Sequence, residues 1–129
     1  MKILIIIAAI SAITSFAPNA CNKKSNNVQC YKGRLEIKAL CMNYTIKLLE
    51  GEMDTSNIAA QWTDEHTGKS YTNVFSLGSP CTFPSSINEG DEFFFTIDTT
   101  TKQECSVCMA YYPKPAKHLA IKVLPGACK

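Results

Sequence analysis

The sequence predicts an all-β domain, either a small barrel or a compact sandwich of six to seven short strands stapled by disulfides. Apolar residues recur with a period of two over several short stretches, which is typical of half-buried strands. Turn signals separate these stretches at regular spacing, and no stretch of the mature chain favours a long helix. Cysteine is frequent, with seven in 129 residues, as in small exported domains.

Residues 30–50 contain the clearest strand pattern. Apolar and charged side chains alternate from residue 34 to residue 41, and the parity shifts by one near Met42 and Asn43. Such a shift requires either a tight turn or a bulge in one long bent strand. Since neither residue is glycine, the sequence favours the bulge. A long bent first strand suits a small barrel of the oligonucleotide/oligosaccharide-binding (OB-like) kind.

The middle of the chain predicts a hairpin. Residues 60–64, which include Trp62, and residues 69–77 have the composition of two strands. The intervening residues 65–68 are a turn signal in which Gly68 would supply a positive φ.

An aromatic strand is expected after the loop at residues 78–90. Residues 92–98 place Phe93 and Phe95 on one face and Phe94 on the other. Because Phe94 interrupts the polar face, we expect this strand to be covered on both sides.

The last part of the chain predicts one more strand. Residues 105–112 are apolar but are followed at once by Pro113, which limits any regular element there. Residues 117–124 alternate again and are followed by a Pro-Gly turn, so this stretch is the expected final strand.

The first 21 residues have the organisation of an export signal. Lys2 supplies a positive charge, and residues 3–17 are uncharged and mostly apolar. This stretch is shorter than the roughly 20 helical residues that span a bilayer core, so it fits the apolar region of a secretory signal. Ala20 and Cys21 match the last two positions of a lipobox, and the stretch resembles the signal peptides of bacterial lipoproteins, although Pro18 and Asn19 depart from that pattern.

The resemblance implies cleavage before Cys21, acylation of Cys21 and contact with the membrane through its acyl chains. Asn22 is not the aspartate that retains lipoproteins at the inner membrane of enteric bacteria, so the resemblance implies the outer membrane of the cell envelope. We therefore expect a signal peptide at 1–20, a lipidated flexible tether at 21–29 and a single β-domain at 30–129. Plain secretion and an uncleaved anchor are the alternatives.

The cysteine count agrees with a lipidated first cysteine. An odd number of cysteines in an exported chain leaves one thiol over. If Cys21 carries lipid, six cysteines remain for three disulfides. We favour Cys30–Cys128 if the first and last strands are neighbours, and expect the next two cysteines to pair with each other or with one of the Cys105/Cys108 pair. The six cysteines are Cys30, Cys41, Cys81, Cys105, Cys108 and Cys128.

The C-x-x-C sequence at Cys105 and Cys108 is the main alternative signal, because it occurs in thiol redox and metal-binding proteins. A redox motif needs its first thiol at a helix N-terminus, and Pro113 prevents a long helix there. Zinc would require Cys81 or His118 to complete a set of four ligands, and no second close cysteine pair is present. Structural disulfides are therefore the favoured interpretation.

Other groups give weaker indications of chemistry. His66 and His118 do not neighbour a nucleophile motif, so we expect solvated side chains. The acidic pairs Asp64-Glu65 and Asp91-Glu92 lie at predicted turns, where acidic residues are common.

Four aromatic residues could line a binding surface or pack into the core. Core packing is favoured for the tryptophan, and strand-edge positions for the tyrosines. These residues are Trp62, Tyr71, Tyr111 and Tyr112.

The chain is close to neutral, with 13 basic and 11 acidic residues, so we expect no nucleic-acid partner. The sequence favours a lipid-anchored envelope protein of unknown ligand with a binding or structural role, not an enzyme and without a cofactor. The alternative is a thiol redox or metal-handling protein that uses Cys105 and Cys108. If Cys21 is not acylated, a secreted cysteine-rich inhibitor or interaction module is a third hypothesis.

Overall fold

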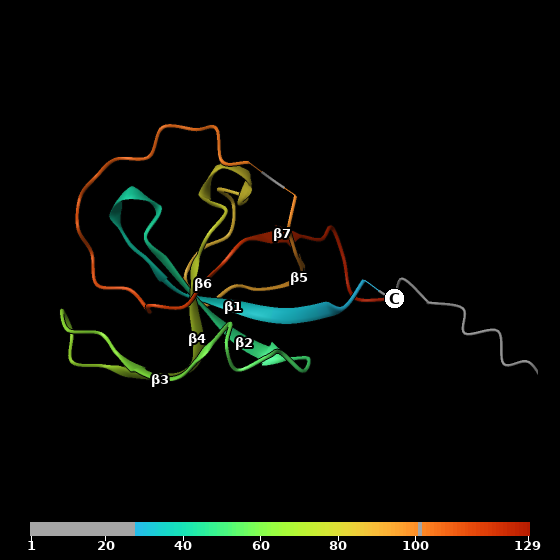
Figure 1. The fold of residues 1–129 in the computed structure, drawn as a ribbon, viewed down its shortest axis with the longest axis horizontal. Coiled ribbons are helices and arrows are strands. Elements are labelled where there is room, and N and C mark those ends of the chain that lie inside the picture. The colour runs from blue at the N-terminus through green and yellow to red at the C-terminus, as the bar shows by residue number, and fades with distance from the viewer. Residues whose placement is uncertain (1–27, 101) are drawn as a thin grey trace, which may run out of the picture.

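The computed structural model describes residues 28–100 and 102–129, which form one seven-stranded sheet with two short 3₁₀ turns (Figure 1). The all-β prediction is confirmed. The predicted signal peptide, Cys21 and most of the predicted tether lie outside the described residues. The elements are β1 (Cys30–Lys38), η1 (Leu40–Met42), β2 (Tyr44–Glu50), β3 (Ala59–Thr63), β4 (Ser70–Leu77), η2 (Pro80–Thr82), β5 (Glu92–Ile97), β6 (His118–Leu119) and β7 (Ile121–Val123).

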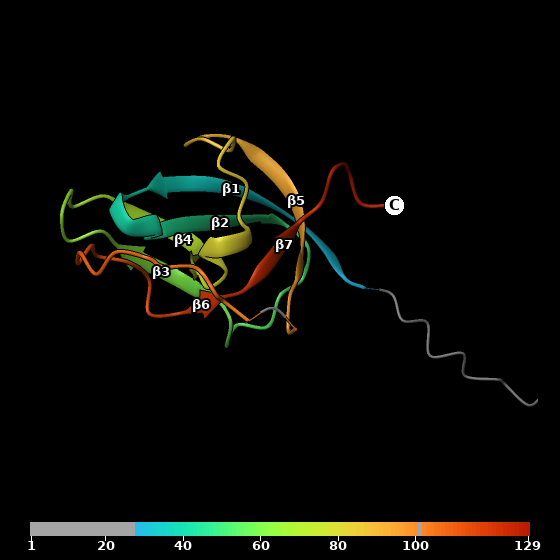
Figure 2. The ribbon, with the colours of Figure 1, turned by 90° about the horizontal axis from the view of Figure 1, so that it is seen from above.

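The strands follow the order β3-β4-β2-β1-β5-β7, and β6 pairs in parallel with β4. The sheet is strongly curled, and Figure 2 shows β5 and β7 running across the line of β1 and β2. The final strand that the sequence predicted over 117–124 is divided at Ala120, because its first half pairs with β4 and its second half with β5. The sheet is consequently not closed into the barrel that the sequence suggested.

Strand β1 lies in the middle of the sheet and organises the core. It pairs with β2 on one side and β5 on the other, and its residues alternate between buried and half-buried positions. Gly33 is one of the buried positions, and a Cβ atom there would lie 3.0 Å from the ring of Phe95. The missing side chain therefore lets the ring pack against β1. The main core comprises Tyr31, Leu35, Ile46, Phe75, Leu77, Phe93, Phe95, Leu119 and Ile121.

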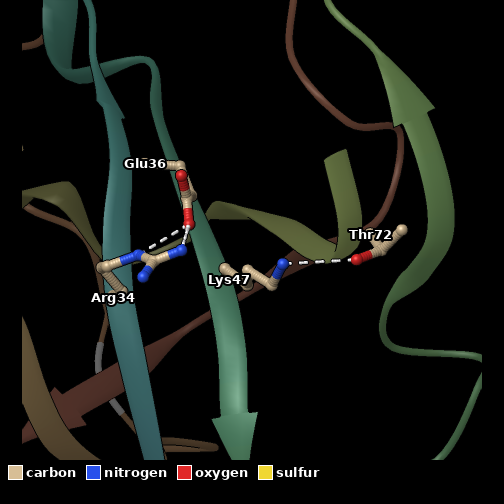
Figure 3. A network of polar contacts seen from close by, with 4 residues as sticks. All are labelled: Arg34, Glu36, Lys47 and Thr72. Atoms are coloured by element: carbon tan, nitrogen blue, oxygen red, sulfur yellow. Dashed lines mark hydrogen bonds and ion pairs between the residues drawn. The ribbon is translucent and has the colours of Figure 1, made fainter. Parts of the chain in front are cut away.

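The opposite face of β1 and β2 carries charged and polar side chains, as the alternating pattern predicts (Figure 3). Arg34 donates to Glu36 Oε1 through Nε at 2.8 Å and through a terminal nitrogen at 2.6 Å. Lys47, which lies opposite Arg34, donates from Nζ to Thr72 Oγ1 at 3.3 Å. The Arg34–Glu36 pair is partly buried, with the Glu36 side chain 12% exposed, so these contacts mark the polar face of the sheet and orient the side chains on it.

The bulge expected near Met42 and Asn43 is wrong. β1 and β2 form an antiparallel hairpin, and η1 connects them as a tight turn. Cys41 and Met42 both adopt positive φ, at 58° and 57°. The left-handed region costs a residue with a Cβ atom roughly 1–2 kcal/mol, and for that reason the absence of glycine argued against a turn. The backbone N–H of Asn43 closes the turn by donating to the Leu40 carbonyl at 3.2 Å.

Gly78 and Ser79, which follow β4, pack against the divided last strand. A Cβ atom on Gly78 would lie 2.9 Å from the backbone nitrogen of Ala120, so the two segments approach more closely there than a side chain allows. The buried Ser79 hydroxyl donates to the Ile121 carbonyl and accepts from the Ile121 amide, both at 2.8 Å. The Ser79 side chain thus supplies strand-like hydrogen bonds where the pairing with β4 ends.

We predict that Gly78→Ala lowers the free energy of unfolding by about 1–3 kcal/mol, because backbone must move to accept the methyl group. Gly126→Ala is the matched control, since no atom lies within 4 Å of its added Cβ and no positive φ is required. We expect the control to change the free energy by less than about 0.5 kcal/mol in chemical denaturation. Equal stability of the two variants would contradict the close approach.

Candidate binding surface

All six described cysteines form disulfides. The structure contains the Cys30–Cys128 bridge favoured from the sequence and resolves the remaining alternatives. Cys105 and Cys108 are bonded to different partners and not to each other, so the C-x-x-C sequence contains no free thiol. The pairs, with their Cα–Cα distances, are Cys30–Cys128 at 5.8 Å, Cys41–Cys108 at 5.0 Å and Cys81–Cys105 at 5.5 Å.

Residues 102–117 form a long loop without a helix or strand, and in the view of Figure 1 this loop runs around the outside of η1 and η2. Residues 102–111 are all exposed, so burial contributes little to their position. Two disulfides hold this loop, one to each 3₁₀ turn. Polar contacts add to them: the Cys81 amide donates to Gln103 Oε1 at 3.0 Å, and Asn43 Nδ2 donates to the Ala110 carbonyl at 3.2 Å.

Exposed apolar side chains gather where the loop meets η1. Six large apolar residues are exposed in the described part of the chain, and five of them flank the Cys41–Cys108 bridge. Met109 is 95% exposed and Tyr111 is 84% exposed. Monomeric soluble proteins rarely leave such groups together without a function. We call this surface the apolar tip; it consists of Leu40, Met42, Val107, Met109 and Tyr111.

A shallow cavity of about 370 Å³ lies within the apolar tip. Met42, Val107, Met109, Tyr111 and Lys114 are among the residues that line it. Lys114 forms no ion pair with another described residue. The surface therefore combines exposed apolar side chains with a hollow of mixed polar and apolar lining and one lysine that is available for a partner.

The apolar tip lies at the far end of the domain from the start of β1. Strand β1 begins at Cys30 and runs for nine residues toward η1, which corresponds to about 30 Å of extended chain. Figures 1 and 2 both show η1 and the start of β1 at opposite ends of the molecule. The tip thus points away from the side on which residues 1–27 join the domain.

The four aromatic candidates divide between this surface and the core. Tyr111 is exposed at the tip. Trp62 stacks on Tyr71 at a ring-centroid distance of 5.8 Å. Tyr71 belongs to a second core cluster, and the partly buried Trp62 and Tyr112 pack against that cluster. Partial burial raises the pKa of the Tyr112 phenol, and the negative charges of Asp64 and Glu89 add to the effect. Tyr112 therefore anchors the loop to the sheet, and Tyr111 faces outward.

Asp64 is the one predicted acidic residue whose side chain is buried, and it has a structural role in the expected β3–β4 hairpin. Its carboxylate accepts from the His66 amide and from Thr67 Oγ1, both at 2.9 Å. Gly68 adopts the expected positive φ of 72°, and its amide donates to the Asp64 carbonyl at 2.7 Å. These hydrogen bonds orient the turn, which explains a buried acid beside an exposed histidine.

The remaining predicted groups lie apart from one another. Glu92 is paired with Lys32 at 2.7 Å, and the hydrogen bond from that ammonium lowers the pKa of Glu92. His118 is exposed at the start of β6. Among the residues that the structure describes, no three His, Cys, Asp or Glu side chains are grouped to hold a metal ion. In the same residues the helical elements are single 3₁₀ turns, and none could cross a bilayer.

Comparison with known proteins finds no matching family model, curated protein or solved structure. The candidate surface consequently rests on the chain's own geometry.

Sequence reasoning found Tyr111 but missed the other members of the apolar tip. The available signal was a short apolar stretch around two cysteines that lacks strand alternation and precedes Pro113. Such a stretch does not fit a half-buried strand, so disulfides are the main contacts left to hold it. Val107, Met109 and Tyr111 remain in solvent, whereas Tyr112 packs on the second core cluster.

We predict that Cys41→Ser/Cys108→Ser releases the loop while the sheet stays folded. Cleavage by chymotrypsin after Tyr111 should become at least about tenfold faster under native conditions and should not depend on low concentrations of denaturant, because the opening is local. The matched control is Cys30→Ser/Cys128→Ser, which removes a bridge far from the loop. Cleavage that requires global unfolding in both variants would show that the loop is held by other contacts.

Proposed function

We propose that this protein is a lipid-anchored component of the bacterial cell envelope that binds another protein through its apolar tip. The three disulfides indicate an exported protein that matures in an oxidising compartment. The lipid anchor, the envelope location and the binding role are the proposal itself and extend past the exported location. The clustering of the exposed apolar residues around the Cys41–Cys108 bridge supports the binding role most directly.

The disulfide pattern supports lipidation of Cys21. The six described cysteines bond to one another, so none is left as a partner for Cys21 within the chain. An unpaired thiol in an exported protein is reactive. Acylation would remove that reactivity, and two or three acyl chains would anchor the protein firmly.

The chemistry of the tip supports a protein partner. Methionine and tyrosine provide large contact areas and adapt to irregular surfaces. The disulfide and the left-handed backbone of Cys41 and Met42 fix the surface in advance, which lowers the entropy lost on binding. The tip is separated from Cys30 by about 30 Å of extended chain. This distance favours a partner that lies away from the membrane in which the acyl chains are inserted.

The thiol redox or metal alternative uses Cys105 and Cys108, and the observed pairing does not favour it. A redox site of this kind cycles between a dithiol and a bond within the motif. Here each cysteine secures the loop to a different 3₁₀ turn. A redox role would therefore require both bridges to break first.

Intact mass of the mature protein, extracted from membranes and measured with and without reductant, tests the anchor and the alternative together. We expect a chain that begins at Cys21, carries acyl groups and gains six hydrogens on reduction, since three disulfides open. The Cys21→Ser variant should no longer be recovered in the membrane fraction. An unmodified Cys21 would rule out the anchor, and two thiols that are free before reduction would favour the redox alternative.

Photo-crosslinking in intact cells tests the binding role. Benzoylphenylalanine at Met109, which is almost fully exposed, should give one discrete crosslinked protein. The crosslink should weaken at least about tenfold when Val107→Asp places a charge among the exposed apolar side chains of the tip. The same probe at the exposed Lys69, on the β3–β4 turn, is the control. No crosslink from Met109, or equal products from both positions, would contradict a specific partner at the tip.

A further inference from the structure

A second apolar surface lies at the other end of the domain, beside the Cys30–Cys128 bridge. It is an open groove of about 530 Å³. Val28, the only exposed large apolar residue of the described chain outside the tip, forms part of its wall and is 70% exposed. We call this surface the apolar groove; it is lined by Val28, Cys30, Thr96 and residues 124–129.

The groove lies where the chain enters the domain. The start of β1 and the end of the chain are neighbours in Figures 1 and 2, joined by the Cys30–Cys128 disulfide. Val28 is the first described residue, and Cys21 stands seven positions before it in the sequence. Seven residues reach at most about 25 Å, so an acyl group on Cys21 would keep the groove within that distance of a bilayer.

Two lysines lie at this end of the domain. Lys129 lines the groove. Lys122 is opposite Thr96 in the β5–β7 ladder, and Thr96 is opposite Cys30 in the β1–β5 ladder. Residues that are paired in this way project from the same face of a sheet, so Lys122 extends beside the groove. Neither lysine forms an ion pair with another described residue.

We propose that the apolar groove is a membrane-contact site, in which Val28, Leu124 and Ala127 meet the acyl region of anionic phospholipids while Lys122 and Lys129 meet the phosphates. The proposal rests on the acylation of Cys21 proposed above. An anchored domain meets lipid at a high effective concentration, so a weak surface is sufficient. An apolar face beside lysines is the composition of surfaces that lie in the headgroup boundary. With the groove on the bilayer, the tip faces the opposite direction.

Fluorescence quenching by brominated lipid tests the contact. The acylated full chain is reconstituted in vesicles of phosphatidylethanolamine and phosphatidylglycerol, with or without bromine on the acyl chains. Trp62 is the only native tryptophan and packs against the second core cluster, so it provides the baseline fluorescence. Ala127→Trp should show at least about twofold quenching of its added fluorescence, because a membrane-contact surface reaches the acyl boundary. Met109→Trp at the tip is the matched control and should stay unquenched.

Charge reversal by Lys122→Glu/Lys129→Glu, made in the Ala127→Trp chain, should reduce the quenching on these anionic vesicles. Intact mass separates the two proposals. If Cys21 is acylated and the chain sediments with vesicles but Ala127→Trp is no more quenched than Met109→Trp, the membrane contact is wrong and the anchor remains. If Cys21 is unmodified, the lipid anchor and the membrane contact are both wrong.

Discussion

The two bridges from the loop to the 3₁₀ turns are the constraint on which the candidate surface depends. Residues 102–111 are exposed, so the hydrophobic effect cannot hold them against the conformational entropy of a free chain. A disulfide restricts the unfolded chain instead, by an amount typically near 2–4 kcal/mol. The Cys41–Cys108 and Cys81–Cys105 bonds therefore hold the loop in place, whereas burial of apolar side chains holds β1 and β5. The shape of the tip is consequently tied to an oxidising compartment.

Local sequence patterns were sufficient for most strands, because alternation reports directly which face of a strand is buried. They were insufficient at η1, where a bond to Cys108 and a hydrogen bond to the loop carbonyl of Ala110 stabilise two left-handed residues. Those partners are 67 residues away, both for the disulfide and for the hydrogen bond. The division of the last strand at Ala120 is equally nonlocal, because it follows from pairing with β4 on one side and β5 on the other.

The candidate site was less accessible to sequence reasoning than the fold. Residues 105–112 were visibly apolar, but apolarity alone does not distinguish a buried segment from one held in solvent by covalent bonds. Tyr111 and Tyr112 illustrate the difference. Although they are adjacent and identical, Tyr111 faces solvent and Tyr112 packs on the second core cluster. The buried Asp64 shows the converse, because its hydrogen bonds within a turn are satisfied locally and need no catalytic role.

The spacing of Cys105 and Cys108 has a structural consequence that differs from redox chemistry. Three residues of extended chain span at most about 11 Å. Since Cys105 is bonded to Cys81 of η2 and Cys108 to Cys41 of η1, the motif limits how far apart the two turns can lie at this end of the sheet. A bond between the two motif cysteines would have to release both turns. The C-x-x-C sequence thus links η1 to η2 covalently. The sheet positions the two turns so that each cysteine of the motif bonds to a different one.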